Sequence, residues 1–337
     1  MSEYHSHPNI TFYTRNKNLW EVMRDDCCAA KERIHFTQYM IFEDSIGCRF
    51  LEVFNEKAKE GVKISLLFDP IGSLRIKNTD HIKSIAENGG SVRFYNDINW
   101  HNFFLPSRWF PRNHSKVMYI DNNVTYVGGM CVADFMIDWH DIHARIEGDI
   151  DDIDGVEMLH SNQYKNRKDR RKVYYELIDR INQAKDYINI ITPYCVPPRG
   201  VIKAWRRAIK RGVKINLILS SETDNPIADY TARYYLRKLL AIGVKIHLYD
   251  AAVLHAKLMI VDGKWATFGS ANMDYLSLCR NKEVNVLVDN QQAIGDLQTI
   301  YDNFEKSTHD ATLDDWRNLS LRQKIMGRLG RIIRRYL

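Results

Sequence analysis

The stretch RNHSKVMYID at positions 112–121 is written a second time in this chain of 337 residues, as LHAKLMIVD at positions 254–262. A His, a Lys and an Asp recur in each copy, and each member of the second copy follows its counterpart by 141 residues. The pair Gly128-Gly129 is matched at the same interval by Gly269-Ser270. One interval shared by so many positions predicts that the chain folds as two similar halves.

The spacing inside each copy is that of an extended strand. Side chains alternate between the two faces of a strand, so the His and the Lys of each copy point to one face and the Asp to the other. Asp121 and Asp262 each stand at the end of their strand, where a turn needs partners for its backbone groups. The sequence therefore predicts that His and Lys share a site and that the Asp does not.

Each Asp is followed by two residues that are typical of a tight turn, Asn122-Asn123 and Gly263-Lys264. Two-residue turns would pair position 121 with 124 and position 262 with 265. This register sets three pairs across the hairpins: Cys131 with His114, Asn272 with His255, and Ser270 with Lys257.

Two histidines and two lysines on converging faces suit a displacement at phosphorus. One imidazole can attack the phosphorus atom while the other protonates the leaving oxygen. The two lysines, with Asn272 and Ser270, can hold the non-bridging oxygens as charge builds up, so neither a metal ion nor a cofactor is needed. For a single copy, an ordinary hairpin explains the pattern equally well; two copies with matched small residues favour a site.

The paired His-x-Lys-x4-Asp motifs resemble those of the phospholipase D superfamily, and the segments around them are similar to bacterial cardiolipin synthases. The similar segments keep their order from about residue 10 to about residue 305 and lie at positions 39–44, 67–73, 139–148, 192–197 and 269–274. Two positions depart from the family pattern, because Cys131 stands where Asn is usual and Tyr275 stands where Arg is frequent.

The resemblance implies an α/β fold of the phospholipase D type: two similar α/β/α halves with mixed sheets, related by a pseudo-twofold axis, and one active site between them. It also implies a phosphohistidine on His114, with His255 as general acid and then general base. The catalytic set is His114, Lys116, Asp121, His255, Lys257 and Asp262. The expected substrate-binding residues are Gly129, His143, Ser270, Asn272 and Glu283. The alternative for His143 is an ordinary core histidine, and Glu283 either orients a catalytic histidine or is a plain surface-strand residue.

The order of predicted elements supports duplication. Residues 18–31, 44–61 and 79–87 read as helices and residues 34–41, 62–68 and 92–95 as strands; the second half repeats the plan with helices at 172–184, 201–211 and 227–241 and strands at 187–192, 213–219 and 244–249. We expect a first half at 1–150, a connection at 151–171, a second half at 172–310 and a C-terminal helix at 311–337. The acidic run at 147–154 reads as a solvated bend, with a metal site as the weaker alternative.

The amino-acid composition excludes few classes of function. The net charge of +6 is compatible with anionic lipid or with nucleic acid, and six cysteines without zinc or disulfide spacing predict reduced thiols in the cytoplasm. No run approaches the roughly 18 apolar residues of a membrane span, so the protein is expected to reach lipid from the surface, at the inner face of the cell membrane.

Two segments are candidates for membrane contact. The aromatic and basic stretch before His114 includes Trp109 and Phe110 and is either a packed loop or an interfacial one. From position 321 a helical stripe of apolar residues is surrounded by cations that include Arg328, Arg331 and Arg334, which suits an anionic bilayer or a helix docked on the body of the protein.

The function expected from these features is transfer of a phosphatidyl group between two phosphatidylglycerol molecules, giving cardiolipin and glycerol. Water as acceptor would instead make a phospholipase D, and nucleic acid as substrate a phosphodiesterase nuclease. A lipid-binding module with a decayed site is the non-enzymatic alternative, supported only by Cys131. The expected partners are phosphatidylglycerol, other anionic phospholipids and the membrane surface, without nucleic acid.

Overall fold

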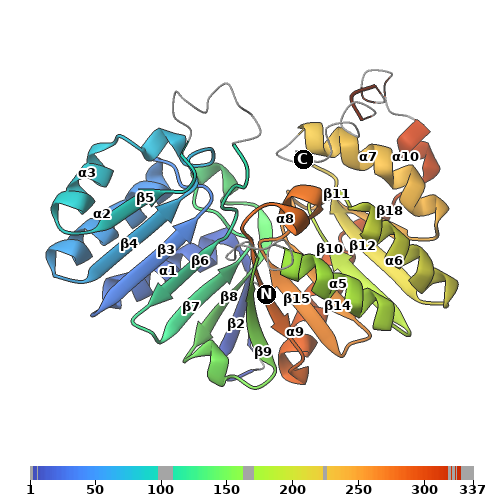
Figure 1. Cartoon of the computed structure of the whole chain (residues 1–337), viewed down its shortest axis with the longest axis horizontal. Coiled ribbons are helices and arrows are strands. Elements are labelled where there is room, and N and C mark those ends of the chain that lie inside the picture. Colours follow the sequence, from blue (N-terminus) through green and yellow to red (C-terminus); the bar gives the residue numbers. More distant parts are fainter. Residues whose placement is uncertain are drawn as a thin grey trace.

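Two eight-stranded mixed sheets lie side by side and fan out from a shared centre in the computed structural model (Figure 1). The structure describes residues 3–5, 7–97, 109–161, 171–222, 226–317, 320, 323 and 325–327. Among the described helices, none combines the length and apolar character that a transmembrane span requires.

The first half holds one sheet and the helices of its outer face. Its elements are β1 (Glu3–Tyr4), β2 (Ile10–Arg15), α1 (Asn16–Ala29), β3 (Arg33–Gln38), α2 (Ser45–Lys59), β4 (Lys63–Phe68), η1 (Leu74–Ile76), α3 (Asp80–Glu87), β5 (Ser91–Phe94), β6 (Val117–Ile120), β7 (Val124–Gly128), η3 (Asp134–Met136), β8 (His140–Glu147) and η4 (Ile150–Asp152).

The second half repeats this order with additions at its end. Its elements are β9 (Val156–His160), α5 (Lys172–Gln183), β10 (Tyr187–Ile191), β11 (Cys195–Val196), α6 (Arg199–Lys210), β12 (Lys214–Ser220), α7 (Pro226–Ala241), β13 (Lys245–Tyr249), β14 (Leu258–Val261), β15 (Trp265–Gly269), β16 (Met273–Asp274), α8 (Tyr275–Cys279), β17 (Val284–Val288), α9 (Gln291–Glu305), β18 (Thr308–Asp310) and α10 (Leu313–Arg317).

The strand orders of the two sheets correspond. The first sheet runs β5-β4-β3-β6-β7-β8-β2-β1, and the second runs β18-β13-β12-β10-β14-β15-β17-β9. In both, three parallel strands are followed by an antiparallel hairpin and a further antiparallel strand. The predicted duplication of two mixed-sheet halves is therefore confirmed.

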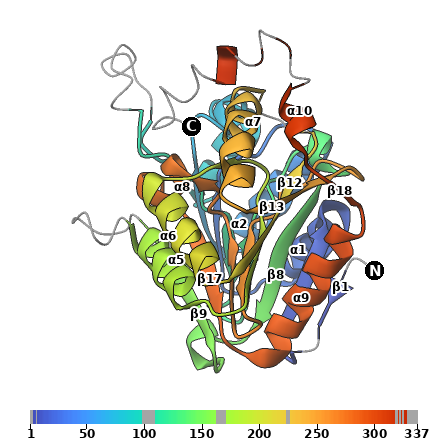
Figure 2. The same ribbon diagram turned by 90° about the vertical axis from the view of Figure 1, so that its right-hand side faces the viewer.

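Three apolar layers hold the molecule together. Helices α1, α2 and α3 pack on the outer face of the first sheet, and α5, α6 and α7 pack on the outer face of the second. Figure 2 shows α5 and α6 side by side on this outer face. Between the sheets, side chains of β2, β7 and β8 meet those of β14, β15 and β17, and α9 closes the same core. Phe12 and Phe268 meet there edge to face, with ring centroids 5.2 Å apart.

The predicted hairpin register is wrong by one residue in both halves. Ile120 pairs with Val124, and Val261 pairs with Trp265, so each connecting loop has three residues instead of two. Asp121 and Asn122 both adopt positive φ, of 50° and 58°, and Asp262 does so at 53°. Each Asp belongs to the turn because its carboxylate binds backbone N–H groups of a neighbouring loop, which a residue within the strand could not reach.

The predicted connection at 151–171 and the C-terminal segment at 311–337 contact different parts of the second half. Residues 156–160 of the predicted connection form β9, which pairs with β17 and so extends the second sheet. Helix α10 lies against α7, and a side-chain carbon at Gly327 would come within 2.5 Å of the main-chain O of Tyr230. Gly327 therefore packs on α7.

The acidic run forms the short turn η4, in which Asp149 accepts a hydrogen bond from the main-chain N of Asp151 (3.1 Å). Across the described residues, His, Cys, Asp and Glu side chains do not gather in groups of three or more suited to a metal ion.

Candidate active site

Short backbone pairings carry each histidine-bearing segment onto the opposite half. The main-chain N of His114 donates to Lys282 O (2.9 Å), and Lys282 N donates to Arg112 O (2.9 Å). In the second half, His255 N donates to His140 O (2.7 Å), which lies in the first half. The two segments therefore cross the boundary between the halves, and both histidines reach the same region.

A carboxylate from the second half holds the histidine of the first. Glu283 Oε2 lies 3.0 Å from His114 Nδ1 and accepts a hydrogen bond of 2.5 Å from Ser270 Oγ. Glu283 is fully buried, and although burial opposes its ionisation, His114 and Lys116 hold its pKa below the usual range. With Nδ1–H donating to this carboxylate, the Nε2 atom of His114 carries the free lone pair.

Burial lowers the pKa of His114 to about 4, against the opposing influence of Glu283, and Lys116 and Lys257 also favour the neutral ring. The imidazole is therefore neutral at pH 7 and available as a nucleophile.

The second histidine is also oriented by a carboxylate, which in this case comes from the first half. Asp141, from the first half, lies 2.7 Å from His255 Nδ1 through its Oδ2 atom. Burial opposes ionisation of Asp141, but Lys257 and His255 outweigh it and the pKa of the carboxyl is lowered. Each half therefore supplies the carboxylate that orients the other half's histidine.

Both motif lysines are buried beside their own histidines. Lys116 Nζ donates to His114 O (2.7 Å) and lies 5.3 Å from the centre of the Tyr39 ring. Lys257 Nζ lies 2.9 Å from His255 Nδ1 and also contacts His255 O. Two buried ammonium groups here favour an anionic ligand.

The two motif aspartates lie away from this region, as the alternation of strand side chains predicts. Asp121 accepts hydrogen bonds from the main-chain N atoms of Lys31, Glu32 and Arg33, at 2.6–2.9 Å. Asp262 does the same for Lys185, Asp186 and Tyr187, at 2.8–2.9 Å. Their contacts are structural ones that join each hairpin to the loop before β3 or β10.

His143, an expected substrate-binding residue, lies in β8, and its contact with substrate stays a prediction. Its ring is buried, neither nitrogen has a hydrogen-bond partner among the described residues, and burial lowers its pKa to about 3. The counterpart of Glu283 is Asp141, two residues earlier. Gly129 lies against this residue, because a side-chain carbon there would come within 2.2 Å of Asp141 Oδ1.

The expected pairs across the hairpins also change. Ser270 binds Glu283 and so supports His114, instead of facing Lys257. Asn272 is buried, and its Nδ2 donates to the hydroxyl of Tyr194 (3.1 Å), while its Oδ1 has no hydrogen-bond partner among the described residues. Cys131 is buried where both Lys116 and Lys257 act on its thiol, although burial dominates and raises its pKa.

Aromatic rings border both histidines, and sequence reasoning missed them. The Tyr39 ring lies 5.0 Å from the His114 ring, and the Trp139 ring lies 5.7 Å from the His255 ring. Tyr39 follows β3, and Tyr194, whose hydroxyl accepts from Asn272, follows β10, the equivalent strand of the second half.

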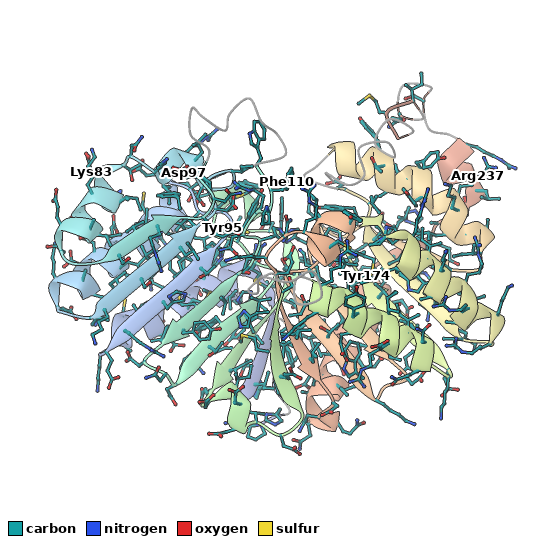
Figure 3. The ribbon with its side chains drawn as sticks, in the orientation of Figure 1. Lys83, Tyr95, Asp97, Phe110, Tyr174 and Arg237 are labelled. Atoms are coloured by element: carbon teal, nitrogen blue, oxygen red, sulfur yellow. The ribbon has the colours of Figure 1, made fainter. Side chains whose placement is uncertain are left out.

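One of the two expected membrane segments can be described in part. Trp109 and Phe110 are half-buried, and Arg280 Cζ lies 5.1 Å from the centre of the Phe110 ring. Figure 3 shows Phe110 near the boundary between the halves, at the upper edge. Arg328, Arg331 and Arg334 lie outside the described residues.

Two similar mixed-sheet halves with one His/Lys centre between them define a phospholipase D-like protein. Residues 24–134 and 177–305 match the family model described as "Cardiolipin synthase, PLD-like domain". This match covers more than half of the chain, and the chain belongs to that family.

Several known proteins are similar in sequence to this chain over most of its length. Cardiolipin synthase 1 of Staphylococcus aureus (strain COL) is 28% identical over 365 residues, covering 96% of this chain and 73% of the relative. Cardiolipin synthase of Clostridium perfringens (strain 13 / Type A) is 28% identical over 379 residues, covering 98% and 78%. The crystal structure of phosphatidylserine synthase from Haemophilus influenzae Rd KW20 superimposes with a TM-score of 0.75 over 99% of this chain and 96% of that one. At 12% identity, the last similarity shows the fold alone.

Proposed function

We propose that this protein is a phosphatidyltransferase of the cardiolipin synthase type, which moves a phosphatidyl group from one phosphatidylglycerol to a hydroxyl group of another. The products are cardiolipin and glycerol. The observation that carries the proposal is the pair of histidines, each oriented by a carboxylate of the opposite half. Family membership and the named relatives support the choice of lipid.

The first step forms a phosphohistidine. The Nε2 lone pair of His114 attacks the phosphorus of the donor lipid, and the bond from phosphorus to the glycerol headgroup oxygen breaks. His255, protonated and oriented by Asp141, gives its proton to that oxygen as glycerol leaves. Buried Glu283 stabilises the positive charge that His114 acquires.

The second step is the reverse displacement with a new acceptor. Neutral His255 takes the proton from a hydroxyl group of a second phosphatidylglycerol, whose oxygen attacks phosphorus. The bond between phosphorus and Nε2 breaks, which restores neutral His114 and protonated His255. Proton and electron pair therefore return to their starting positions after one cycle.

The non-bridging oxygens need positive or hydrogen-bonding partners in both steps. The ammonium groups of Lys116 and Lys257 supply the positive charge, and they stay protonated in both steps. Asn272 can contribute a donor when its carboxamide is turned by 180°, because Tyr194 then donates to Oδ1 and Nδ2 takes the position that has no partner among the described residues. Asp121 and Asp262 hold the hairpins and take no part in bond making.

Phosphatidylglycerol and other anionic phospholipids in a membrane are the partners of this reaction. The proposed location is the inner face of the cell membrane, with peripheral attachment through Trp109, Phe110 and the cations Arg328, Arg331 and Arg334. The half-buried aromatic pair beside the site supports this arrangement.

Mass spectrometry of the products from purified protein and phosphatidylglycerol vesicles tests the proposal. Cardiolipin and glycerol in equal amounts are expected. Phosphatidic acid as the main product would instead make the protein a phospholipase D, and cleavage only of a DNA substrate would make it a nuclease.

The variants His114→Ala and His255→Ala complete the test. Both should bind vesicles as the unmodified protein does and lose turnover. If the unmodified protein forms no product but binds vesicles equally well, the lipid-binding module without catalysis is the correct alternative.

A further inference from the structure

Large apolar side chains are exposed on one part of the first half. Among the described residues, seven large hydrophobic side chains are exposed, and four of them are Ile71 (44%), Leu74 (65%), Phe135 (50%) and Ile137 (38%). The first two follow β4 and the other two follow β7. Isolated exposed apolar residues are ordinary, but a contiguous group indicates a contact surface.

Contacts through Phe42 join these loops into one surface. The Phe42 ring lies 5.9 Å from the Phe135 ring, and Arg75 Cζ lies 5.5 Å from the centre of the Phe42 ring. Ser73, in the same loop as Leu74, donates through Oγ to Tyr39 O (3.1 Å) and fixes this loop beside the segment that contains Phe42. We call Phe42, Ile71, Leu74, Phe135 and Ile137 the rim patch.

The rim patch is continuous with the catalytic centre. The Phe135 ring lies 5.4 Å from the Trp139 ring, which in turn lies 5.7 Å from His255. On the other side, Tyr39 packs on His114. Phe135 is therefore one side chain away from His255, and the loop of Leu74 is linked to His114 through Tyr39.

Cations flank the rim patch. Arg75 covers Phe42, and beside Ile137 a cavity of about 380 Å³ is lined by Lys17, Arg24 and Arg49 together with apolar and acidic side chains. Arginine over an aromatic ring is suited to the headgroup level of a bilayer, where one end of the pair is apolar and the other is wet.

Acids lie among these cations: Glu21 lines the same cavity, exposed Asp138 follows Ile137, and others are engaged within the protein. Asp134 accepts hydrogen bonds from the main-chain N atoms of Ser45 and Ile46 at the start of α2, and Asp44 accepts from Gly47 N (2.9 Å). Glu43 lies 2.9 Å from His81. The surface therefore offers exposed apolar side chains with charged groups of both signs around them, an arrangement suited to the headgroup level of a bilayer.

We infer that the rim patch docks on an anionic lipid bilayer, with its apolar side chains at the boundary between headgroups and acyl chains. The inference rests on the proposed function, because a phospholipid substrate must pass from a bilayer to the two histidines. Docking here would deliver headgroups to the site without removing the whole lipid from the membrane.

A double charge substitution tests the inference. Leu74→Glu with Phe135→Glu adds two negative charges to the patch, and Tyr175→Glu with Leu313→Glu makes the matched change at exposed apolar residues of the second half (43% and 46%). Cosedimentation with phosphatidylglycerol/phosphatidylcholine vesicles should weaken by at least about tenfold for the first protein and by less than about twofold for the second.

Two further measurements separate docking from misfolding and from catalysis. Thermal melting and hydrolysis of bis(p-nitrophenyl) phosphate, a small soluble phosphodiester, should match the unmodified protein. If the glutamate pair lowers the melting temperature, Leu74→Ser with Phe135→Ser replaces it, and the same loss of vesicle binding is expected.

Three results would overturn the inference: unchanged vesicle binding by the patch variant, equal weakening in both variants, or a dimer in light scattering that only the patch variant dissociates. The last result would identify the patch as an interface between copies of the chain. Patch-dependent vesicle binding without cardiolipin among the products would leave the docking surface intact and refute the proposed function alone.

Discussion

At the scale of single residues, the carboxylate behind each histidine sets its chemistry. Glu283 and Asp141 are both buried and both lie within 3.0 Å of a histidine Nδ1 atom. Such a carboxylate fixes the tautomer and stabilises the charged ring that forms during transfer.

Asp141→Asn should therefore lower turnover by about 10²–10⁴-fold, because the amide can hold the His255 ring but cannot balance its charge. Initial rates with phosphatidylglycerol vesicles measure this effect. Vesicle binding should be unchanged, and an active Asp141→Asn protein would show that this carboxylate has no part in proton transfer.

Asp121→Asn serves as the matched comparison, since Asp121 binds three backbone N–H groups away from the histidines. Loss of charge-assisted hydrogen bonds should reduce the free energy of unfolding by about 1–3 kcal/mol. Turnover per folded molecule should stay within about threefold of the unmodified protein, a limit that follows from its structural role. Denaturant titration and initial rates together decide between a structural and a catalytic aspartate.

The buried His143 ring makes the free energy of unfolding depend on pH. Its pKa falls from the ordinary value of 6.5 to about 3 on folding. The unfolded chain therefore binds a proton that the folded chain does not, and stability is lost as the pH falls from 6.5 towards 3. His143→Leu should lose about 2–3 kcal/mol less stability between pH 6.5 and 4.5 than the unmodified protein.

Unfolding in urea at both pH values tests this, with His5→Leu at an exposed histidine as control. Equal acid sensitivity of the two variants would assign the loss to other buried groups, such as His114 and His140, whose pKa values are also lowered to about 4.

Some of the site residues could be predicted from the sequence and others could not. His114, Lys116, His255 and Lys257 follow from the repeat, Glu283 was expected among the substrate-binding residues, and the structure places Glu283 on His114. Asp141 was missed because the carboxylates are separated by 142 residues while the motifs are separated by 141. At the constant interval the counterpart of Glu283 is Ile142, whose side chain is in the core between the sheets.

At the scale of elements, main-chain geometry positions the nucleophile. Lys282 N donates to Arg112 O and Lys282 O accepts from His114 N, both at 2.9 Å. Lys282→Pro removes the donor and should lower turnover by about 100-fold or more, as expected when a reacting group is displaced by about 1 Å.

Lys282→Ala keeps both main-chain groups and removes only the side chain, which lies over the Tyr95 ring at 4.3 Å. This variant should retain turnover within about fivefold, given the modest energy of a cation–π contact. Initial rates of the two proteins give the comparison, and equal losses would assign the effect to the Lys282 side chain.

Helices and strands were predictable because their apolar periods are regular, and the predicted helix at 172–184 corresponds to α5, Lys172–Gln183. The hairpin loops were not, because their length depends on a contact remote in sequence: Asp121 must reach the N–H groups before β3. Local turn chemistry favoured two residues, and this tertiary contact imposed three.

At the scale of the whole molecule, one core joins the halves. Phe268 packs on Phe12 between the sheets, and both are almost fully buried. Phe268→Ala should reduce the free energy of unfolding by about 3–5 kcal/mol. Circular dichroism and tryptophan fluorescence should still report one shared transition, whereas two separate transitions would indicate halves that unfold independently.

The chain's duplication was visible from sequence, but the exchange of carboxylates between halves was not. Periodicity reports what each half repeats, while the exchange depends on how the two repeats face each other. No local pattern records that relation.

The exchange also limits what an ancestor could have been. A polypeptide with one repeat would possess a histidine yet lack the acid that steadies it, since that acid arrives from a second repeat. Self-association of such an ancestor about a twofold axis would have supplied that acid. Gene fusion would then have made the assembly permanent and freed its two imidazoles to diverge, one towards nucleophile and the other towards proton carrier.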